Sequence, residues 1–112
     1  MMASTMSSSF ANFEDAKLET LAIATLRRTG AEQAAALRDS TGRTYVAINI
    51  ATPSFSVDAV TAVFTVAMAS QISGIEAIVV VGDGPVHLHP VRDYAPQCLI
   101  WYRDVTGEMT AL

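Results

Sequence analysis

The chain has 112 residues, of which 51% are hydrophobic and 16% charged, and its formal net charge is −4. This length fits one domain, and the scattered Lys and Arg residues exclude the clustered positive charge of a nucleic-acid-binding surface. No apolar run reaches the ~18 residues of a membrane span, so we expect no contact with a membrane. The single cysteine, Cys98, excludes an intrachain disulfide, and the first residues lack the pattern of a secretory signal. We therefore expect a cytoplasmic protein. The high hydrophobic content predicts that a second copy of the chain covers part of its apolar surface.

The beginning of the chain differs in composition from the rest. Residues 1–12 are Ser-rich and poor in core-forming side chains, which predicts a disordered tail ahead of a single domain over residues 13–112. Apolar residues at helical spacing predict a helix for Phe13–Arg28, with the acidic residues Glu14 and Asp15 in its first turn.

The next segment has the pattern of a β-hairpin. Asp39–Gly42 is rich in turn-forming residues and lies between extended runs at Gln33–Arg38 and Thr44–Ala51. The second run is rich in β-branched and aromatic residues, whereas the alanine-rich first run is assigned as a strand by its partner.

A long apolar helix is predicted for Ser56–Gln71. Ser56 can cap its first turn, and Asp58 suits the positive end of the helix dipole. A helix that is apolar on nearly every side is a buried one, so we expect this helix at the centre of the core.

The last third of the chain predicts two strands and little helix. Ile75–Val81 is typical of a strand buried on both faces, and Cys98–Tyr102 is the last clear strand. Between them, Val86–Tyr94 is polar and irregular, and Pro90 and Pro96 limit any helix to about one turn. Strands separated by helical segments favour parallel pairing beside the antiparallel hairpin. We predict an α/β fold with α-β-α layers: a mixed sheet with an N-terminal β-hairpin, helices packed on it and a shortened third helix.

Three stretches carry a family resemblance: AALRDSTGRTYVAINIATPSF (35–55), GIEAIVVVGDG (74–84) and APQCLIWYRDVTG (95–107). With the apolar helix between the first two, the chain resembles the small cytidine deaminase and blasticidin-S deaminase family over roughly residues 13–107. The resemblance implies zinc hydrolysis. In that family a Cys or His at the start of the core helix and two cysteines of a P-C-x-x-C motif hold Zn²⁺, and a glutamate moves protons.

The positions that correspond to these groups carry other residues here. The triplet of ligand and glutamate corresponds to Asp58-Ala59-Val60, and Val60 can neither accept nor donate a proton. The cysteine motif corresponds to Pro90–Tyr94, with Val91 and Tyr94 at the cysteine positions. We therefore expect neither a catalytic residue nor a zinc cofactor.

Two alternatives stay open at individual residues. Asn49, which stands in the family's ribose-binding N-x-E motif, is either a remnant ligand contact or, as we favour, a bond to a neighbouring loop. His87 and His89 would point to one side of an extended segment, so that with Asp83, Asp93 or Asp58 they would form an alternative metal site. The interpretation that we favour makes the histidines part of a solvated loop and Asp58 a residue of the helix cap.

The preferred function is that of a catalytically inactive, cytidine deaminase-like pseudoenzyme, acting as a binding or structural protein. Because relatives assemble as dimers or tetramers through the core helix, the resemblance implies a homodimer or homotetramer; a different protein partner is the other option. The alternative is an active relative, then a hydrolase of the cytidine deaminase type, or a small-molecule binder with a remodelled pocket at Asn49 and residues 83–94. An α/β scaffold unrelated to deaminases is the third possibility.

Overall fold

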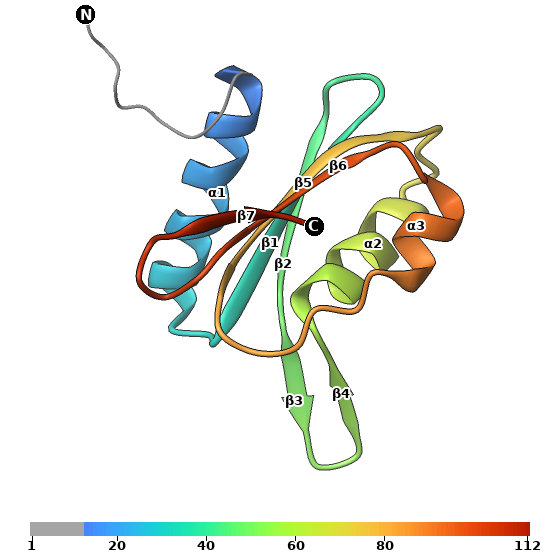
Figure 1. Cartoon of the computed structure of the whole chain (residues 1–112). Helices are drawn as coiled ribbons and strands as arrows, with labels where there is room; N and C mark the ends of the chain where they lie inside the picture. Colours follow the sequence, from blue (N-terminus) through green and yellow to red (C-terminus); the bar gives the residue numbers. More distant parts are fainter. Residues whose placement is uncertain (1–12) are drawn as a thin grey trace, which may run out of the picture.

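The computed structural model describes residues 13–112 of the chain, and the predicted tail over residues 1–12 lies outside them. The elements in chain order are α1 (Phe13–Thr29), β1 (Gln33–Asp39), β2 (Thr44–Ile48), β3 (Ile50–Thr52), β4 (Phe55–Val57), α2 (Ala59–Ala69), β5 (Ile75–Gly82), α3 (His89–Tyr94), β6 (Leu99–Arg103) and β7 (Met109–Ala111). Figure 1 shows α1 on one side of the sheet and α2 with α3 on the other. The ribbon of β3 and β4 continues from β2 beyond the end of the sheet.

The main sheet is mixed, with strands in the order β2-β1-β5-β6-β7. β1 is antiparallel to both β2 and β5, whereas β5 and β6 are parallel. The predictions of an α/β fold and of a parallel pair beside an antiparallel hairpin are therefore confirmed. β7, antiparallel to β6, is a strand that the sequence analysis does not predict.

The alanine-rich strand β1 lies inside the sheet, and all seven of its residues are buried. Ala34 and Ala36 belong to the core cluster on the side of α1, whereas Ala35 and Leu37 belong to the cluster on the side of α2. Alternate residues of a strand point to opposite faces, so small side chains here let helices lie close on both sides. Tertiary packing therefore favours this strand in spite of its weak β-propensity.

The second strand of the hairpin is shorter than the predicted Thr44–Ala51. Asn49 interrupts it: the Asn49 backbone N–H donates to the Gln33 carbonyl at 3.2 Å, and Asn49 Oδ1 accepts from the Gln33 N–H at 3.0 Å. The chain then leaves the main sheet, and β3 pairs with β4, with Ile50 opposite Val57.

The apolar helix is shorter at both ends than the predicted Ser56–Gln71. Ser56 is not its cap, because Ser56 lies in β4 and pairs within the small β3–β4 sheet. The N-cap is Asp58, whose backbone is extended and whose side chain accepts a hydrogen bond from the Thr61 N–H. A carboxylate caps a helix about as well as a hydroxyl, so the cap lies where the extended segment ends.

The prediction of burial on all sides of this helix is wrong. Ala59, Val60 and Val63 are fully buried against the sheet, but the opposite face is open, and Val66 is 44% exposed. α2 packs on one face of the sheet and forms an outer layer, so only the side of the helix that faces the sheet belongs to the core. Within residues 13–112, no helix has both the length and the apolar character needed to cross a membrane.

Candidate functional site

A cleft of about 350 Å³ opens where the start of β1, the β3–β4 ribbon, the start of α2 and the loop after β5 meet. Its lining residues are mostly polar: Glu32, Gln33, Asn49, Ala51, Ser56, Val57, Asp58, Thr61, Asp83, Gly84, Pro85 and His87. The cleft brings together Asn49, Asp58 and His87, which the sequence analysis names as candidates. Glu32 and Asp83 add two exposed carboxylates, so the cleft carries acidic groups and no Lys or Arg.

Asp58 is the buried carboxylate of this cleft, and it is surrounded by donors. Its Oδ1 accepts from Thr61 Oγ1 at 2.5 Å and from His87 Nδ1 at 3.0 Å. Its Oδ2 accepts from the His87 backbone N–H at 3.1 Å and from the Thr61 backbone N–H at 3.4 Å. Burial raises the pKa of Asp58, but the hydrogen bonds from Thr61 and His87 outweigh burial and leave this pKa below its ordinary value. Asp58 is therefore an ionised cap residue, and His87 Nδ1 is the donor in their contact.

Gln33 is a residue of the cleft that the sequence analysis misses. Its side chain is buried, with 1% exposed. Gln33 Nε2 donates to the Pro85 carbonyl at 3.0 Å, and Gln33 Oε1 accepts from the Ala59 N–H at 2.8 Å. One amide thus joins the first strand to the start of α2 and to the loop after β5. The only signal in the sequence is a long polar side chain at the head of a strand of buried alanines.

Asn49 acts as a structural residue, through a partner other than the expected loop. Its Oδ1 accepts from the backbone N–H of Gln33 in β1, so the side chain fastens the end of β2 to the neighbouring strand. Asn49 also lines the cleft, and its Nδ2 makes no hydrogen bond to another described residue. This amide can therefore donate to a molecule in the cleft.

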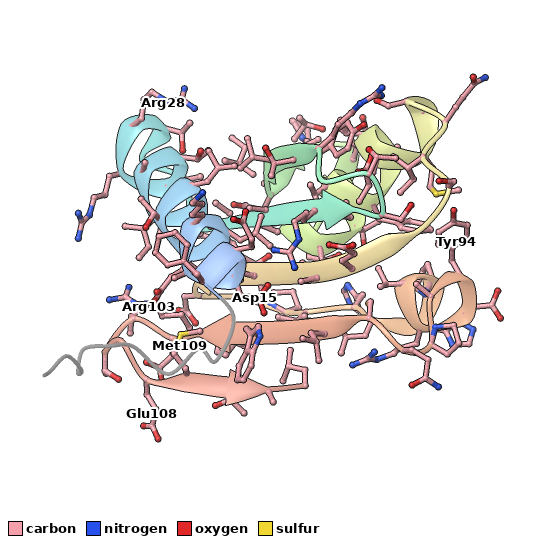
Figure 2. All side chains as sticks on the ribbon, turned by 90° about the horizontal axis from the view of Figure 1, so that it is seen from above. Asp15, Arg28, Tyr94, Arg103, Glu108 and Met109 are labelled. Atoms are coloured by element: carbon pink, nitrogen blue, oxygen red, sulfur yellow. The ribbon has the colours of Figure 1, made fainter. Side chains whose placement is uncertain are left out.

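The other positions that correspond to family site residues lie outside the cleft. Val60 and Val91 are fully buried in the core cluster between the sheet and α2. Tyr94 lies at the end of α3 (Figure 2), where its ring packs edge-on against Phe64 at 6.0 Å between centroids. The Tyr94 hydroxyl donates to the Ile72 carbonyl at 3.3 Å. None of these three side chains lines the cleft.

The two histidines do not share one side of an extended segment. Leu88 between them has helical dihedral angles (φ −102°, ψ −12°), so the chain turns there and His89 begins α3. Both histidines are exposed, but His87 contacts Asp58, whereas His89 lies in the helix away from it. In the part of the chain that the structure describes, no group of three or more His, Cys, Asp or Glu side chains is arranged to hold a metal ion. The alternative metal site of His87, His89 and Asp58 is therefore not assembled.

The chain as a whole is similar to proteins of known fold. A family model described as "Cytidine deaminase-like" matches residues 11–107. Among solved structures, the crystal structure of cytidine deaminase from Burkholderia pseudomallei matches with a TM-score of 0.73 at 19% sequence identity. This match covers 87% of the present chain and 90% of that chain, and at this identity it shows the fold alone. No curated protein matches the chain.

Proposed function

The chain belongs to the cytidine deaminase-like family, and we propose that it is a member without deaminase activity that acts as a self-associating binding or structural protein. The observation that carries the proposal is the packing of the positions corresponding to catalytic and zinc-binding residues. Val60 and Val91 fill the apolar core, where neither a metal ion nor a proton-transferring group would have polar partners. Tyr94, at another such position, packs on Phe64 and donates to the Ile72 carbonyl. Asp58, at the remaining one, has its carboxylate oxygens occupied by donors from Thr61 and His87.

The donor set of the chain does not fit a zinc site. A stable site needs four ligands, or three and a water, drawn from Cys, His, Asp and Glu. The described residues hold no group of three such side chains, and residues 1–12 contain none of these residue types. Cys98, the single thiol, is buried in the core cluster rather than in the cleft. A reaction route through zinc therefore has no support from these residues.

Self-association is supported by the surface around α2. Asp58 is the only charged residue between Thr44 and Ile75, and it is buried. This stretch forms a groove of about 420 Å³ lined by Ala47, Ile48, Ile50, Phe55, Val57, Ala62, Thr65 and Val66. Apolar patches of this kind are typical of interfaces between proteins.

A second copy of the chain is the occupant that fits this groove. Around a two-fold axis the same patch meets itself, and a surface without charges does so without like-charge repulsion. Phe55 lies in β4, on the ribbon that extends beyond the sheet (Figure 1), and it lines the groove while 56% exposed, so its ring offers apolar area to a second copy. The high hydrophobic content of the whole chain agrees with this arrangement.

The absence of deaminase chemistry is tested on the purified protein by two measurements. Elemental analysis is expected to find zinc well below one atom per chain, and assays with cytidine and deoxycytidine are expected to release no ammonia. Stoichiometric zinc together with turnover would overturn the proposal. Turnover without a metal would also overturn it, and would indicate a different deamination mechanism.

Self-association is tested by light scattering on the protein and on matched variants. Phe55→Asp and Val66→Asp put a charge into the groove and are expected to reduce the mass of the dimer or tetramer to that of a monomer. Phe13→Asp is the control, because Phe13 is also exposed but lies on α1, on the other side of the sheet. A monomeric wild-type protein at micromolar concentration would refute self-association. So would variants in the groove that keep the wild-type mass.

A second candidate, binding of a small neutral molecule, is favoured by one observation. The cleft is lined by Asn49, whose Nδ2 is available as a donor, and by the loop from Asp83 to His87. Titration with cytidine, followed by melting temperature and amide chemical shifts, tests this candidate. Saturable shifts at residues of the cleft that disappear in Asn49→Ala would support it, whereas unchanged spectra would exclude cytidine as the ligand.

A further inference from the structure

The start of α2 and the loop after β5 are held together by hydrogen bonds to one carboxylate. His87 approaches Asp58 twice, with its backbone N–H at 3.1 Å and its ring Nδ1 at 3.0 Å. Asp58 in turn is fixed by the two hydrogen bonds from Thr61 that cap the helix. Two contacts from one residue fix both the position of the loop and the orientation of the imidazole.

Gln33 adds a second connection between the same segments. Its amide bridges the Ala59 N–H, in the first turn of α2, and the Pro85 carbonyl, in the loop. The loop is therefore fastened at Pro85 and His87, and the helix at Asp58 and Ala59. All these contacts come from within one chain, so they do not depend on the self-association proposed above.

The family resemblance assigns metal ligands to the start of the core helix and to the proline-initiated motif. The network reaches the first of these directly, and it reaches the second through the loop that leads into the motif. In this chain the motif is α3, which begins two residues after His87. We propose that the network of Asp58, His87 and Gln33 is a metal-free lock that fastens the loop and the start of α3 to α2, in the structural role that a bound ion would have. The described part of the chain thus has no ligand set for zinc, and hydrogen bonds connect α2 to the loop in place of an ion.

The lock predicts that the fold needs no ion and depends on His87. An excess of EDTA is expected to leave the melting temperature of the wild-type protein unchanged. His87→Ala is expected to lower it by roughly 4 to 8 °C, the effect of one ordinary hydrogen bond in a domain of this size, because the His87 side chain is 68% exposed and water weakens its contact with Asp58. His89→Ala is the matched control, because His89 is exposed as His87 is but makes no hydrogen bond to another described residue.

A second variant separates the lock from the helix cap. Asp58→Ser keeps a side chain that caps helices well but is too short to reach His87. Amide exchange followed by NMR is expected to be roughly tenfold faster at the backbone N–H of position 87 in this variant. Adding His87→Ala to Asp58→Ser is expected to change the melting temperature little further, since both substitutions break the same contact.

Three outcomes would overturn the lock: melting that EDTA lowers, equal effects of His87→Ala and His89→Ala, or additive effects of the two substitutions in the double variant. Light scattering of His87→Ala distinguishes a failure of the lock from a failure of the proposed function. The lock predicts a destabilised chain of wild-type oligomeric mass, because His87 does not line the apolar groove.

Discussion

Gln33→Met tests whether a single buried amide holds the cleft together. Methionine nearly conserves the volume of glutamine, so the substitution removes hydrogen bonds without opening a large cavity. Removing Gln33 Oε1 leaves the buried Ala59 N–H without an acceptor. Removing Gln33 Nε2 leaves the Pro85 carbonyl without a donor. A buried polar group without a partner costs about 1–3 kcal/mol. Pro85 is exposed, so water can replace the donor to its carbonyl at a smaller cost.

The expected loss in the free energy of unfolding is therefore about 2–4 kcal/mol, a large part of the ~5–15 kcal/mol of a typical domain. Urea unfolding followed by far-UV circular dichroism measures this loss as a lower midpoint with an unchanged slope. Gln97→Met is the control, because Gln97 is exposed near α3 and makes no hydrogen bond to another described residue. A loss below about 1 kcal/mol in Gln33→Met, or an equal loss in the control, would refute the role given to Gln33.

Three further substitutions test the core, the hairpin turn and the proposed absence of deaminase activity. Arg38→Met leaves the buried Asp15 carboxylate without the guanidinium that lies 2.9 Å away. Urea unfolding should therefore show a loss of about 3–5 kcal/mol in the free energy of unfolding, and adding Asp15→Asn should partly restore it. An unchanged free energy of unfolding would contradict a structural ion pair. Burial raises the pKa of Asp39, but hydrogen bonds from Thr41 and from the Arg43 N–H leave it below its ordinary value. The stability that Asp39 contributes is thus present above about pH 4 and is lost as the pH falls through the lower folded pKa. Asp39→Asn should therefore be less stable than wild type at neutral pH and should lose less stability on acidification. Equal losses of stability in the two proteins on acidification would contradict this assignment. Val60→Glu places a carboxylate in the apolar core, so it should lower the melting temperature and restore neither zinc binding nor turnover; an active variant would show that the site needs one residue only.

Much of the fold follows from local patterns in the sequence. The turn at Asp39–Gly42 and the apolar run Ile75–Val81 each predict an element that the structure contains with nearly the same bounds. These elements are specified by residues close together in the chain, so periodicity and turn composition are enough to find them. The end of β2 is different, because Asn49 leaves the ladder through hydrogen bonds to Gln33 in another strand.

The site was harder to predict for the same physical reason. The position of Asp58 near the start of the apolar helix predicts its place in the cap region, although the sequence predicts the cap itself at Ser56, and the capping partner Thr61 is only three positions away. Its contact with His87 spans 29 residues, and the contact of Gln33 with Pro85 spans 52. No local pattern encodes such contacts, since they depend on how the loop after β5 returns to the start of α2. The open face of α2 cannot be predicted in this way, because composition does not distinguish a helix buried in the core from one whose exposed side is apolar.

Under the proposal that the chain has no deaminase activity, the location of the positions corresponding to site residues explains how the fold is kept. Ligand and proton-transfer groups are polar and have to be held inward, so they carry a desolvation penalty that a bound ion offsets. Val60 and Val91 replace that demand with apolar packing in the core cluster, which needs no ion. Asp58, the buried charged group among these positions, cannot be left unpaired at the edge of this core, and Thr61 and His87 supply its donors. The apolar residues at positions 60 and 91 and the hydrogen bonds to Asp58 therefore depend on each other. Without the apolar residues, polar groups in the core would lack a partner, and without the donors Thr61 and His87, Asp58 would lack one.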